Sequence, residues 1–506
     1  MKRLHPIMLA GTGSDVGKSV LATALCRILL QDGYHPAPFK AQNMALNSYA
    51  TPEGLEIGRA QAVQAEAAGI PCHTDMNPLL LKPQSDHTSQ VVLHGIPIGN
   101  RDAYDFWRKS PSTPTQPISS TQPIDFRQEV CAAFDRLSQH YNPIVMEGAG
   151  SISEINLRDH DLVNMPMARH ANADVILVGD IDRGGVFASV YGSIALQTPE
   201  DRKLIKGIII NKFRGDLRLF EDGRKMLEEL CGIPVLGVVP YYKDIHIEEE
   251  DSVALGRKAG GQLSTLNSHP STVSVAVVLL RHLSNFTDFN VLERDPRVHL
   301  FYTNNTDDLL KSDIILIPGS KSTLSDLYEL RRNGVAQAII RAHRQGATVM
   351  GICGGYQMMG MEVCDPQHVE GDIDRLPGLG LLPTTTTMSG EKVTRQVTCE
   401  YGSGYEIHMG ETRPHNAASS PLLHLDDGTE DGYFVDDHCM GTYVHGILDN
   451  PPFIERLLAP FKDKLAQTAQ TFDYKAFKEE QYDKLAAHVR QHLDMQRLYQ
   501  LLTPNS

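Results

Sequence analysis

A glycine-rich loop at residues 11–19 (GTGSDVGKS) is the feature that most restricts how this chain can fold. The apolar run 7–10 precedes the loop, and residues 18–31 place apolar side chains at a helical period. In such a strand–loop–helix unit, backbone N–H groups and the positive end of the helix surround phosphate groups. Lys18 would reach the β- and γ-phosphates, and the Ser19 hydroxyl would bind Mg²⁺. The loop therefore predicts a nucleotide site at the edge of a parallel sheet.

The spacing within this loop departs slightly from the common GxxxxGK[ST] pattern. Thr12 stands where the first glycine would be, and Gly11 comes one residue early, whereas Gly13 and Gly17 remain available for the phosphate-binding turn. This one-residue extension resembles the loop of dethiobiotin synthetase and its relatives, which phosphorylate a carboxylate or a carbamate. The resemblance favours ATP as the nucleotide.

Polar residues follow other expected strands of the same sheet. Glu147 comes directly after the strand-like run 143–146, and its place resembles that of the acidic Mg²⁺ ligand in the dethiobiotin synthetase group. Lys40 ends another short run and could reach the transferred phosphoryl group. Asn211 follows a strand where that superfamily recognises the nucleotide base. Asp180 or Asp182 could contribute too, although either could simply cap a helix.

The order of apolar runs indicates two doubly wound α/β domains. Strands are expected in the first half at residues 7–10, 143–146, 175–179, 207–211 and 235–239, and in the second at 273–280, 298–302, 314–317 and 348–350. We expect a P-loop, dethiobiotin-synthetase-like domain at 1–248, a linker at 249–272, a flavodoxin-like domain at 273–460, and a helical tail at 461–506. Residues 110–123, rich in Pro, Ser and Thr, are expected to form an irregular loop.

Composition excludes several classes of protein. The 506 residues carry 47 Lys and Arg against 62 Asp and Glu, a net charge of −15, which argues against nucleic acid as a partner. The eight cysteines are scattered without a CxxC pair, which disfavours a zinc site or a disulfide framework. No apolar run approaches the roughly 18 residues of a membrane span. A cytoplasmic enzyme with no membrane contact is expected, and a homo-oligomer is compatible with the sequence.

A second motif, residues 348–357 (TVMGICGGYQ), predicts a cysteine nucleophile. Cys353 would lie on a sharp turn between a strand and a helix, where glycines permit a strained backbone. The helix N-terminus favours a thiolate, and the N–H group of Gly354 could stabilise an oxyanion. A second oxyanion donor is expected from the turn at Gly319.

The thiolate needs a base, for which His445 in the segment 442–446 (TYVHG) is the best candidate and His408 the rival. The pair Cys353 and His445 resembles the class I glutamine amidotransferases, which release ammonia from glutamine. Their usual acid lies two residues after the histidine, where this chain has Ile447. The acid is therefore either absent, leaving a dyad, or supplied elsewhere, with Glu406 and Asp449 as candidates.

Taken together, the two modules resemble the cobyric acid synthase family over nearly the whole chain. Further segments that agree are KAQNMALN at 40–47, GRAQ at 58–61, LLKPQSD at 80–86, DRGG at 182–185, IPGSK at 317–321 and GYEIHMG at 404–410. The loop 110–123 departs from the family. The resemblance implies amidation of the b, d, e and g carboxylates of adenosylcobyrinic acid a,c-diamide, a corrinoid, with ATP, Mg²⁺ and glutamine. Arg59, Lys82 and Arg183 are the candidate contacts for this substrate.

Three alternatives stay open at the level of sequence. A sister enzyme that amidates the a and c carboxylates shares both modules, although the segment 40–47 favours the first assignment. A P-loop switch or partitioning ATPase would need no glutaminase half. Finally, the C-terminal half could be an inactive regulatory domain, in which case only free ammonia would support amidation.

Overall fold

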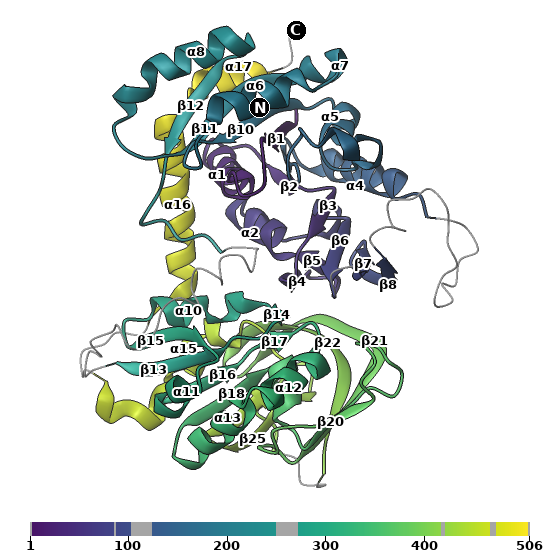
Figure 1. Ribbon diagram of the computed structural model, residues 1–506, viewed down its shortest axis with the longest axis vertical. Coiled ribbons are helices and arrows are strands. Elements are labelled where there is room, and N and C mark those ends of the chain that lie inside the picture. The colour runs from purple at the N-terminus through teal and green to yellow at the C-terminus, as the bar shows by residue number, and fades with distance from the viewer. Residues whose placement is uncertain are drawn as a thin grey trace.

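The computed structural model describes residues 3–84, 88–102, 124–248, 272–415, 420–465 and 472–503. The chain forms two halves stacked along its long axis, and a long C-terminal helix runs beside the first half and down toward the second (Figure 1). The predicted loop at 110–123 and nearly all of the predicted linker lie outside the described residues.

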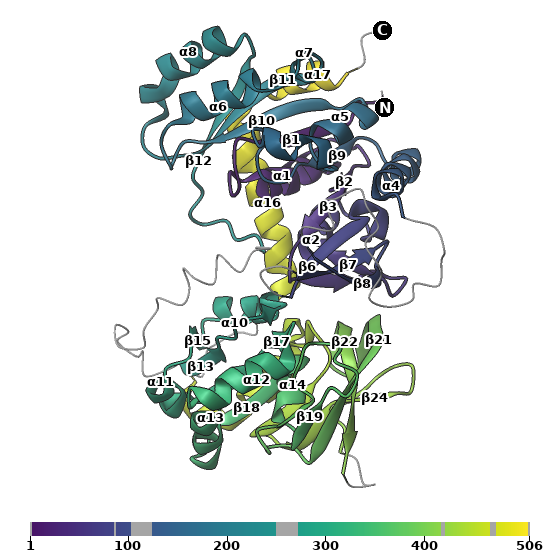
Figure 2. The ribbon, with the colours of Figure 1, turned by 45° about the vertical axis from the view of Figure 1, so that its right-hand side comes forward.

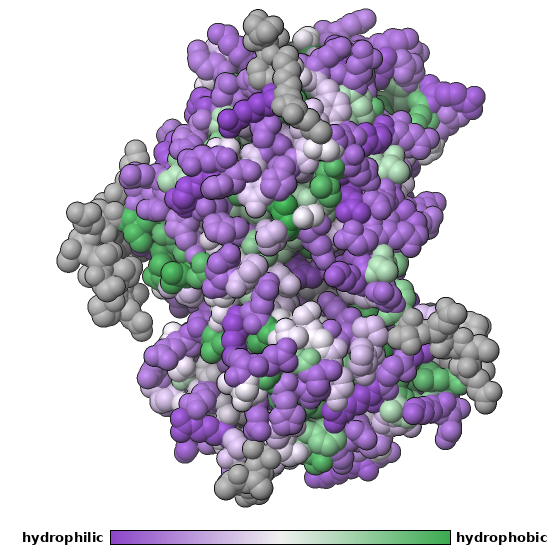
Figure 3. Space-filling model, turned by 180° about the vertical axis from the view of Figure 1, so that it is seen from behind, coloured by the Kyte–Doolittle hydropathy of each residue, from purple (hydrophilic) through white to green (hydrophobic). Residues whose placement is uncertain are grey.

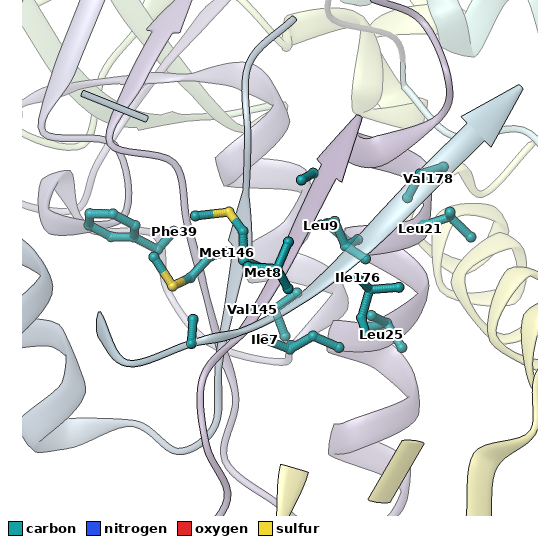
Figure 4. Packing of buried hydrophobic residues seen from close by; sticks show 14 of the residues in the cluster. Ile7, Met8, Leu9, Leu21, Leu25, Phe39, Val145, Met146, Ile176 and Val178 are labelled. Carbon is teal, nitrogen blue, oxygen red and sulfur yellow. The ribbon is translucent and has the colours of Figure 1, made fainter. Parts of the chain in front are cut away.

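The first half is built on a six-stranded parallel sheet in the order β12-β11-β10-β1-β9-β2. Its strands are β1 (Ile7–Gly11), β2 (Ala37–Phe39), β9 (Ile144–Glu147), β10 (Asp174–Asp180), β11 (Ile205–Phe213) and β12 (Val235–Pro240). Side chains of the central strands pack against α1 (Lys18–Gln31) in a closely filled core, where Leu21 and Leu25 lie beside Ile176 (Figure 4). The expected strands and the first helix are confirmed, with ends shifted by at most two residues.

Helices cover both faces of this sheet, as a parallel sheet requires. They are α1, α2 (Arg59–Ala67), α4 (Phe126–His140), α5 (Met165–Ala171), α6 (Val186–Ala195), α7 (Pro199–Arg202) and α8 (Glu221–Cys231), with the short turns η1 (Thr74–Met76), η2 (Ile155–His160) and η3 (Leu217–Phe220).

A second, smaller sheet of the first half faces the other half of the molecule (Figure 2). It has the order β3-β6-β7-β8, formed by β3 (Gln42–Met44), β6 (Leu79–Pro83), β7 (Thr88–Leu93) and β8 (Ile96–Asp102). Beside it lies the pair β4 (Ser48–Ala50) and β5 (Glu56–Gly58). Of the segments that the sequence singled out, 40–47 includes β3, 80–86 includes most of β6, and 58–61 joins the end of β5 to the start of α2, so all three lie at or beside this small sheet.

The second half has a six-stranded sheet in the order β15-β13-β16-β18-β26-β25, parallel except for its edge strand β25. The strands are β13 (Val273–Val278), β15 (Val298–Thr303), β16 (Ile314–Ile317), β18 (Thr348–Ile352), β25 (Tyr433–Asp436) and β26 (Cys439–Thr442). Around them lie α10 (Asn290–Arg294), α11 (Thr306–Lys311), α12 (Thr323–Arg332), α13 (Val335–Arg344), α14 (Gly354–Met359) and α15 (Pro451–Leu458). Two doubly wound α/β halves are therefore confirmed.

A layer of mostly antiparallel strands covers one side of the second half and was not expected from the sequence. It consists of β19 (Glu362–Cys364), β20 (Arg375–Pro377) and a long hairpin of β21 (Thr384–Cys399) and β22 (Gly402–Pro414). Shorter pieces are β14 (Leu283–Ser284) with β17 (Gly319–Ser320), β23 (Leu423–His424) with β24 (Glu430–Asp431), and the turns η5 (Phe286–Phe289), η6 (Ile447–Asp449) and η7 (Ala459–Lys464). The hairpin reaches the first half, because β22 and β21 contact β4.

The C-terminal tail returns to the first half. Helix α16 (Tyr474–His492) packs along α1, and α17 (Met495–Leu502) contacts β12. Leu485, Val489 and Leu498 belong to the hydrophobic core of the first half. The C-terminal tail therefore completes a hydrophobic core whose other members belong to the first half.

The surface seen from behind is mostly hydrophilic, with small and separate hydrophobic patches (Figure 3). Among the helices of the described residues, none has both the length and the apolar character needed to cross a membrane.

Candidate active sites

The phosphate loop has the expected strand–loop–helix geometry. Lys18 folds back over the loop, and its Nζ donates to the carbonyl oxygens of Gly13 at 3.1 Å and Gly150 at 2.9 Å. These carbonyls therefore hold the lysine where phosphate oxygens would be expected to meet it. Burial lowers the pKa of Lys18 to about 8, although the nearby Glu147 carboxylate acts in the opposite direction.

Glu147 lies next to Ser19 at the carboxyl end of β9. The Ser19 Oγ donates to Glu147 Oε1 at 2.6 Å, Lys40 Nζ lies 3.3 Å from the same oxygen, and Gln64 Nε2 donates to Oε2 at 2.9 Å. Burial disfavours a charged carboxylate, yet Lys40, Ser19 and Gln64 together hold the pKa of Glu147 below its usual value. The hydroxyl and the ionised carboxylate form an all-oxygen pair that suits Mg²⁺. Lys18, Ser19, Lys40 and Glu147 are thus brought together.

Asn211 lies beneath the loop. Its Nδ2 donates to the Val16 carbonyl oxygen at 2.8 Å, and a Cβ atom at Gly17 would come within 2.2 Å of that nitrogen. Gly17 has a φ of 98°, a left-handed conformation that glycine adopts without strain. Oδ1 of Asn211 is buried without a hydrogen-bond partner among the described residues, so it keeps an acceptor available. Its contact with the base remains a prediction.

Cys353 occupies a strained turn between β18 and α14. Its φ of 53° and ψ of −112° are unusual for a residue with a side chain, and such strain is characteristic of nucleophiles on tight turns. No larger residue fits at the neighbouring glycines. A Cβ at Gly355 would lie 1.9 Å from the Ile317 carbonyl oxygen, and one at Gly351 would lie 2.6 Å from the backbone of Gly355. The Cys353 Sγ lies 3.5 Å from the carbonyl oxygen of Ile407.

His445 has a carboxylate partner, but it is neither of the two that the sequence suggested. The Nδ1 of His445 lies 2.7 Å from Oδ2 of Asp288, and Oδ1 of Asp288 accepts from the backbone N–H of Gly446 at 3.0 Å. Both side chains are buried. Burial alone would lower the pKa of His445, but the charges of Asp288 and Cys353 raise it to about 10. The idea of a dyad without an acid is therefore wrong for this geometry.

Neither of the two suggested acids is the carboxylate that His445 Nδ1 contacts. Glu406 accepts from Arg395 Nε at 2.5 Å, on the hairpin. Burial raises the pKa of Asp449 to about 7, a direction opposite to that of a carboxylate held ionised beside an imidazolium. Asp288 was missed because it lies on η5, after the short strand β14, and carries no local motif that pairs it with a histidine 157 residues away.

The rival base, His408, also lines the cavity of Cys353, but its surroundings differ. It stacks on Tyr443 with ring centroids 3.7 Å apart, and its Nδ1 lies 3.2 Å from the Gly410 carbonyl oxygen. Burial lowers the pKa of His408 to about 4. An imidazole with so low a pKa is a weak base, whereas His445 has the Asp288 carboxylate beside it, so the geometry favours His445.

The expected oxyanion donors lie side by side. Gly354 is the first residue of α14, so its N–H group has no acceptor within the helix. A Cβ at Gly354 would lie 2.8 Å from the backbone nitrogen of Ser320, and one at Gly319 would lie 3.3 Å from Cε1 of His445. Gly354 therefore lies against the turn that holds Gly319, and Gly319 lies beside the imidazole of His445.

The candidate substrate contacts are occupied by carboxylates of the chain. Arg59 is buried, donates to Glu248 Oε2 at 2.7 Å and stacks on the Tyr49 ring. Arg183 pairs with Asp15 beside the phosphate loop at 3.2 Å. Neither is brought to a common substrate site with Lys82, so their role as substrate contacts stays a prediction.

Lys82 lies at the boundary between the halves. Its Nζ donates to Glu56 Oε1 at 2.7 Å, while Lys392 Nζ from the hairpin donates to Glu56 Oε2 at 2.5 Å. Burial would raise the pKa of Glu56, but the two lysines hold it well below its usual range. Lys82 and Lys392 also line the cavity that contains Cys353. The wall of the Cys353 cavity is thus formed partly by the first half.

Comparisons with known proteins agree with this arrangement. Residues 7–253 match the family model described as CobQ/CobB/MinD/ParA nucleotide binding domain, and residues 274–453 match the CobB/CobQ-like glutamine amidotransferase domain. The chain is 74% identical to a cobyric acid synthase of Bacteroides fragilis, covering 100% of this chain and 99% of the relative. It is 70% identical to that of Phocaeicola vulgatus and 47% identical to that of Syntrophobacter fumaroxidans, with at least 99% of each chain covered.

A nucleotide-binding α/β half joined to a glutaminase-type half defines a glutamine-hydrolysing carbon–nitrogen ligase. Within that class, the identity over the full length makes the assignment specific: the chain belongs to the cobyric acid synthase family, whose place is in cobalamin biosynthesis.

Proposed function

We propose that this chain converts adenosylcobyrinic acid a,c-diamide to adenosylcobyric acid by amidating its b, d, e and g carboxylates. Each round would consume one ATP and one glutamine, with the carboxylate activated as an acyl phosphate. The proposal is supported by the family to which the chain belongs and by two contacts between candidate catalytic side chains, that of Ser19 with Glu147 and that of His445 with Asp288.

At the phosphate loop, Lys18 would leave the carbonyls of Gly13 and Gly150 and bind the phosphate oxygens of ATP. Ser19 and Glu147 would hold Mg²⁺, which neutralises phosphate charge when bound. A carboxylate oxygen of the substrate would attack the γ-phosphorus, and ADP would leave. Lys40, buried beside Glu147, would balance the charge of the transferred phosphoryl group.

In the second half, the Cys353 thiolate would attack the side-chain amide of glutamine, and Gly354 and Gly319 would donate to the oxyanion. His445, oriented by Asp288, would give a proton to the leaving ammonia. Water would then hydrolyse the thioester and release glutamate. Ammonia would displace phosphate from the acyl phosphate to form the amide.

The observation that carries the proposal is the shared wall of the glutaminase cavity. Lys82, a residue of the first half, lines the same cavity as Cys353. Ammonia is mostly protonated in neutral water and is then no nucleophile, so a direct passage between the halves protects it. An isolated switch ATPase would have no use for such a wall.

The test is to incubate the enzyme with the a,c-diamide, MgATP and glutamine and to follow the product by mass spectrometry. Up to four successive acid-to-amide conversions are expected. Cys353→Ser should abolish the glutamine-dependent reaction but keep the reaction with ammonium salts, whereas Lys18→Ala should abolish both. A product amidated only at the a and c positions, starting from the unamidated corrinoid, would instead support the sister reaction.

A further inference from the structure

A cavity beside the phosphate loop carries the strongest inference beyond the proposed function. Its walls come from Gln42 on β3, from Ala149 and Gly150 after β9, and from the segment around η2 and the start of α5. The carbonyl oxygen of Gly150 accepts from Lys18 Nζ at 2.9 Å, so the cavity shares an edge with the phosphate site. A carboxylate held in this cavity would therefore meet the γ-phosphate of ATP.

Part of the cavity wall is apolar. Ile152, Leu162 and Met165 line it, together with Leu157 on η2. Leu157 is 45% exposed, and its neighbour on η2, Ile155, is 50% exposed. Leu157 lines the cavity, and a large apolar side chain that stays half-exposed at a cavity wall is characteristic of a surface for an apolar ligand.

Polar groups at the same cavity have a definite chemistry. Gln42 is 8% exposed, and its Oε1 has no hydrogen-bond partner among the described residues. Because buried polar atoms are nearly always paired, an unpartnered acceptor at a cavity wall calls for a donor from a ligand. Two arginines and three carboxylates, Glu154, Asp161 and Asp201, also line the cavity. Arg169 is paired with Asp201, whereas Arg158 donates one hydrogen bond from Nη2 to the Leu196 carbonyl oxygen at 2.7 Å, so its guanidinium is the cation that a ligand carboxylate would meet.

We propose that this cavity, between Gln42, the Gly150 turn and η2, binds the face of the corrinoid that carries the carboxylate being activated. The inference rests on the proposed function and adds the location of the substrate. The apolar part of the wall fits the corrin ring, Arg158 fits one of the carboxylates, and Gln42 Oε1 fits the N–H group of a side chain that is already a carboxamide.

The experiment uses full-length protein and adenosylcobyrinic acid a,c-diamide, whose visible absorbance reports binding in equilibrium dialysis without glutamine. Leu157→Asp should weaken corrinoid binding by at least tenfold, because it places a carboxylate against the ring and its acids. The matched control is Leu219→Asp, since Leu219 is also an exposed leucine on a short turn, η3, and does not line the cavity. The control should bind within twofold of the wild type.

A second variant, Gln42→Leu, tests the polar wall and should also weaken corrinoid binding and raise the corrinoid KM. ATP binding and glutamine hydrolysis should stay at wild-type levels in all three variants, which shows that they are folded. Equal corrinoid affinity in Leu157→Asp and Leu219→Asp would overturn the assignment of the cavity. A wild-type enzyme that neither binds nor amidates the a,c-diamide would instead contradict the proposed function itself.

Discussion

At the scale of single residues, the most informative contact is that between Asp288 and His445. A carboxylate that accepts the Nδ1–H of a histidine fixes its tautomer and stabilises the imidazolium formed during catalysis. We therefore expect Asp288→Asn to lower glutamine-dependent turnover by about 10²- to 10⁴-fold, while ammonia-dependent amidation continues. The measurement is glutamate release and amide formation with each nitrogen source.

Two isosteric controls separate this role from a general effect of removing buried charge. Asp449→Asn and Glu406→Gln remove the carboxylates that lie close in sequence to the histidines but do not contact Nδ1 of His445. Both should keep the wild-type pH profile of glutamine hydrolysis. In Asp288→Asn, by contrast, the alkaline limb should move to lower pH, because His445 loses the charge that holds its proton. An unchanged alkaline limb would rule out the positioning role.

The same pair makes a prediction about stability. The pKa of His445 is about 10 in the folded chain, against an ordinary value of 6.5. A histidine whose pKa is higher in the folded chain than in the unfolded chain adds to the free energy of unfolding. This contribution is fully present below the pKa of the unfolded chain and is lost as the pH rises through the pKa of the folded chain. In urea, the free energy of unfolding of the wild type should exceed that of Asp288→Asn by about 3 kcal/mol near pH 6.5. This difference should shrink as pH approaches and passes 10; a constant difference would contradict the assignment.

At the scale of elements, the turn between β18 and α14 depends on glycines that touch the neighbouring strand. A Cβ at Gly355 would lie 1.9 Å from the Ile317 carbonyl oxygen, so Gly355→Ala must push α14 away from β16. We expect loss of glutamine hydrolysis with retained ammonia-dependent amidation. Gly371→Ala is the control, because a Cβ there meets no heavy atom within 4 Å. Full glutaminase activity in Gly355→Ala would show that the turn tolerates displacement.

The elements that sequence could predict are those whose signal is local. β1, α1 and β16 appear as short apolar runs or as a helical period, and their bounds follow closely. The small sheet β3-β6-β7-β8 and the hairpin of β21 and β22 could not be predicted so, because their strands mix polar and apolar residues at a domain boundary. The same holds for the sites. Residues in glycine-rich turns can be predicted from the local sequence, whereas the role of Asp288 depends on its contact with a residue that is distant in the sequence.

At the scale of the whole molecule, the tail ties the last helices to the first half. The backbone of β12 touches it closely: a Cβ at Gly237 would lie 2.1 Å from the carbonyl oxygen of His492. Gly237→Ala should therefore loosen α16 and α17 from the core and lower the melting temperature of the ATP-binding half. Gly192→Ala, on a helix surface with no heavy atom within 4 Å of the added Cβ, should be neutral or slightly stabilising. The melting temperatures of Gly237→Ala and Gly192→Ala, measured by calorimetry with and without ATP, distinguish these two outcomes.

The contact between the halves is built around a buried charge. Glu56 is 1% exposed and lies between Lys82 of its own half and Lys392 of the glutaminase hairpin. Removing one member of a buried ionic group leaves the others uncompensated, at a cost of about 3–5 kcal/mol. In Glu56→Gln the two ammonium groups would repel each other, and the hairpin would move away from β5 and β6.

Because this contact forms the wall of the Cys353 cavity, its loss should uncouple the two reactions. We expect Glu56→Gln to release several glutamates per amide formed, where the wild type releases about one, since ammonia would escape to solvent and become protonated. The double variant Glu56→Gln/Lys392→Met removes the repulsion, so it should regain part of the stability while remaining uncoupled. Glu411→Gln, an exposed carboxylate on the same hairpin, should leave the ratio unchanged. A ratio near one in Glu56→Gln would mean that ammonia passes between the halves by another path, one that does not depend on this ionic wall.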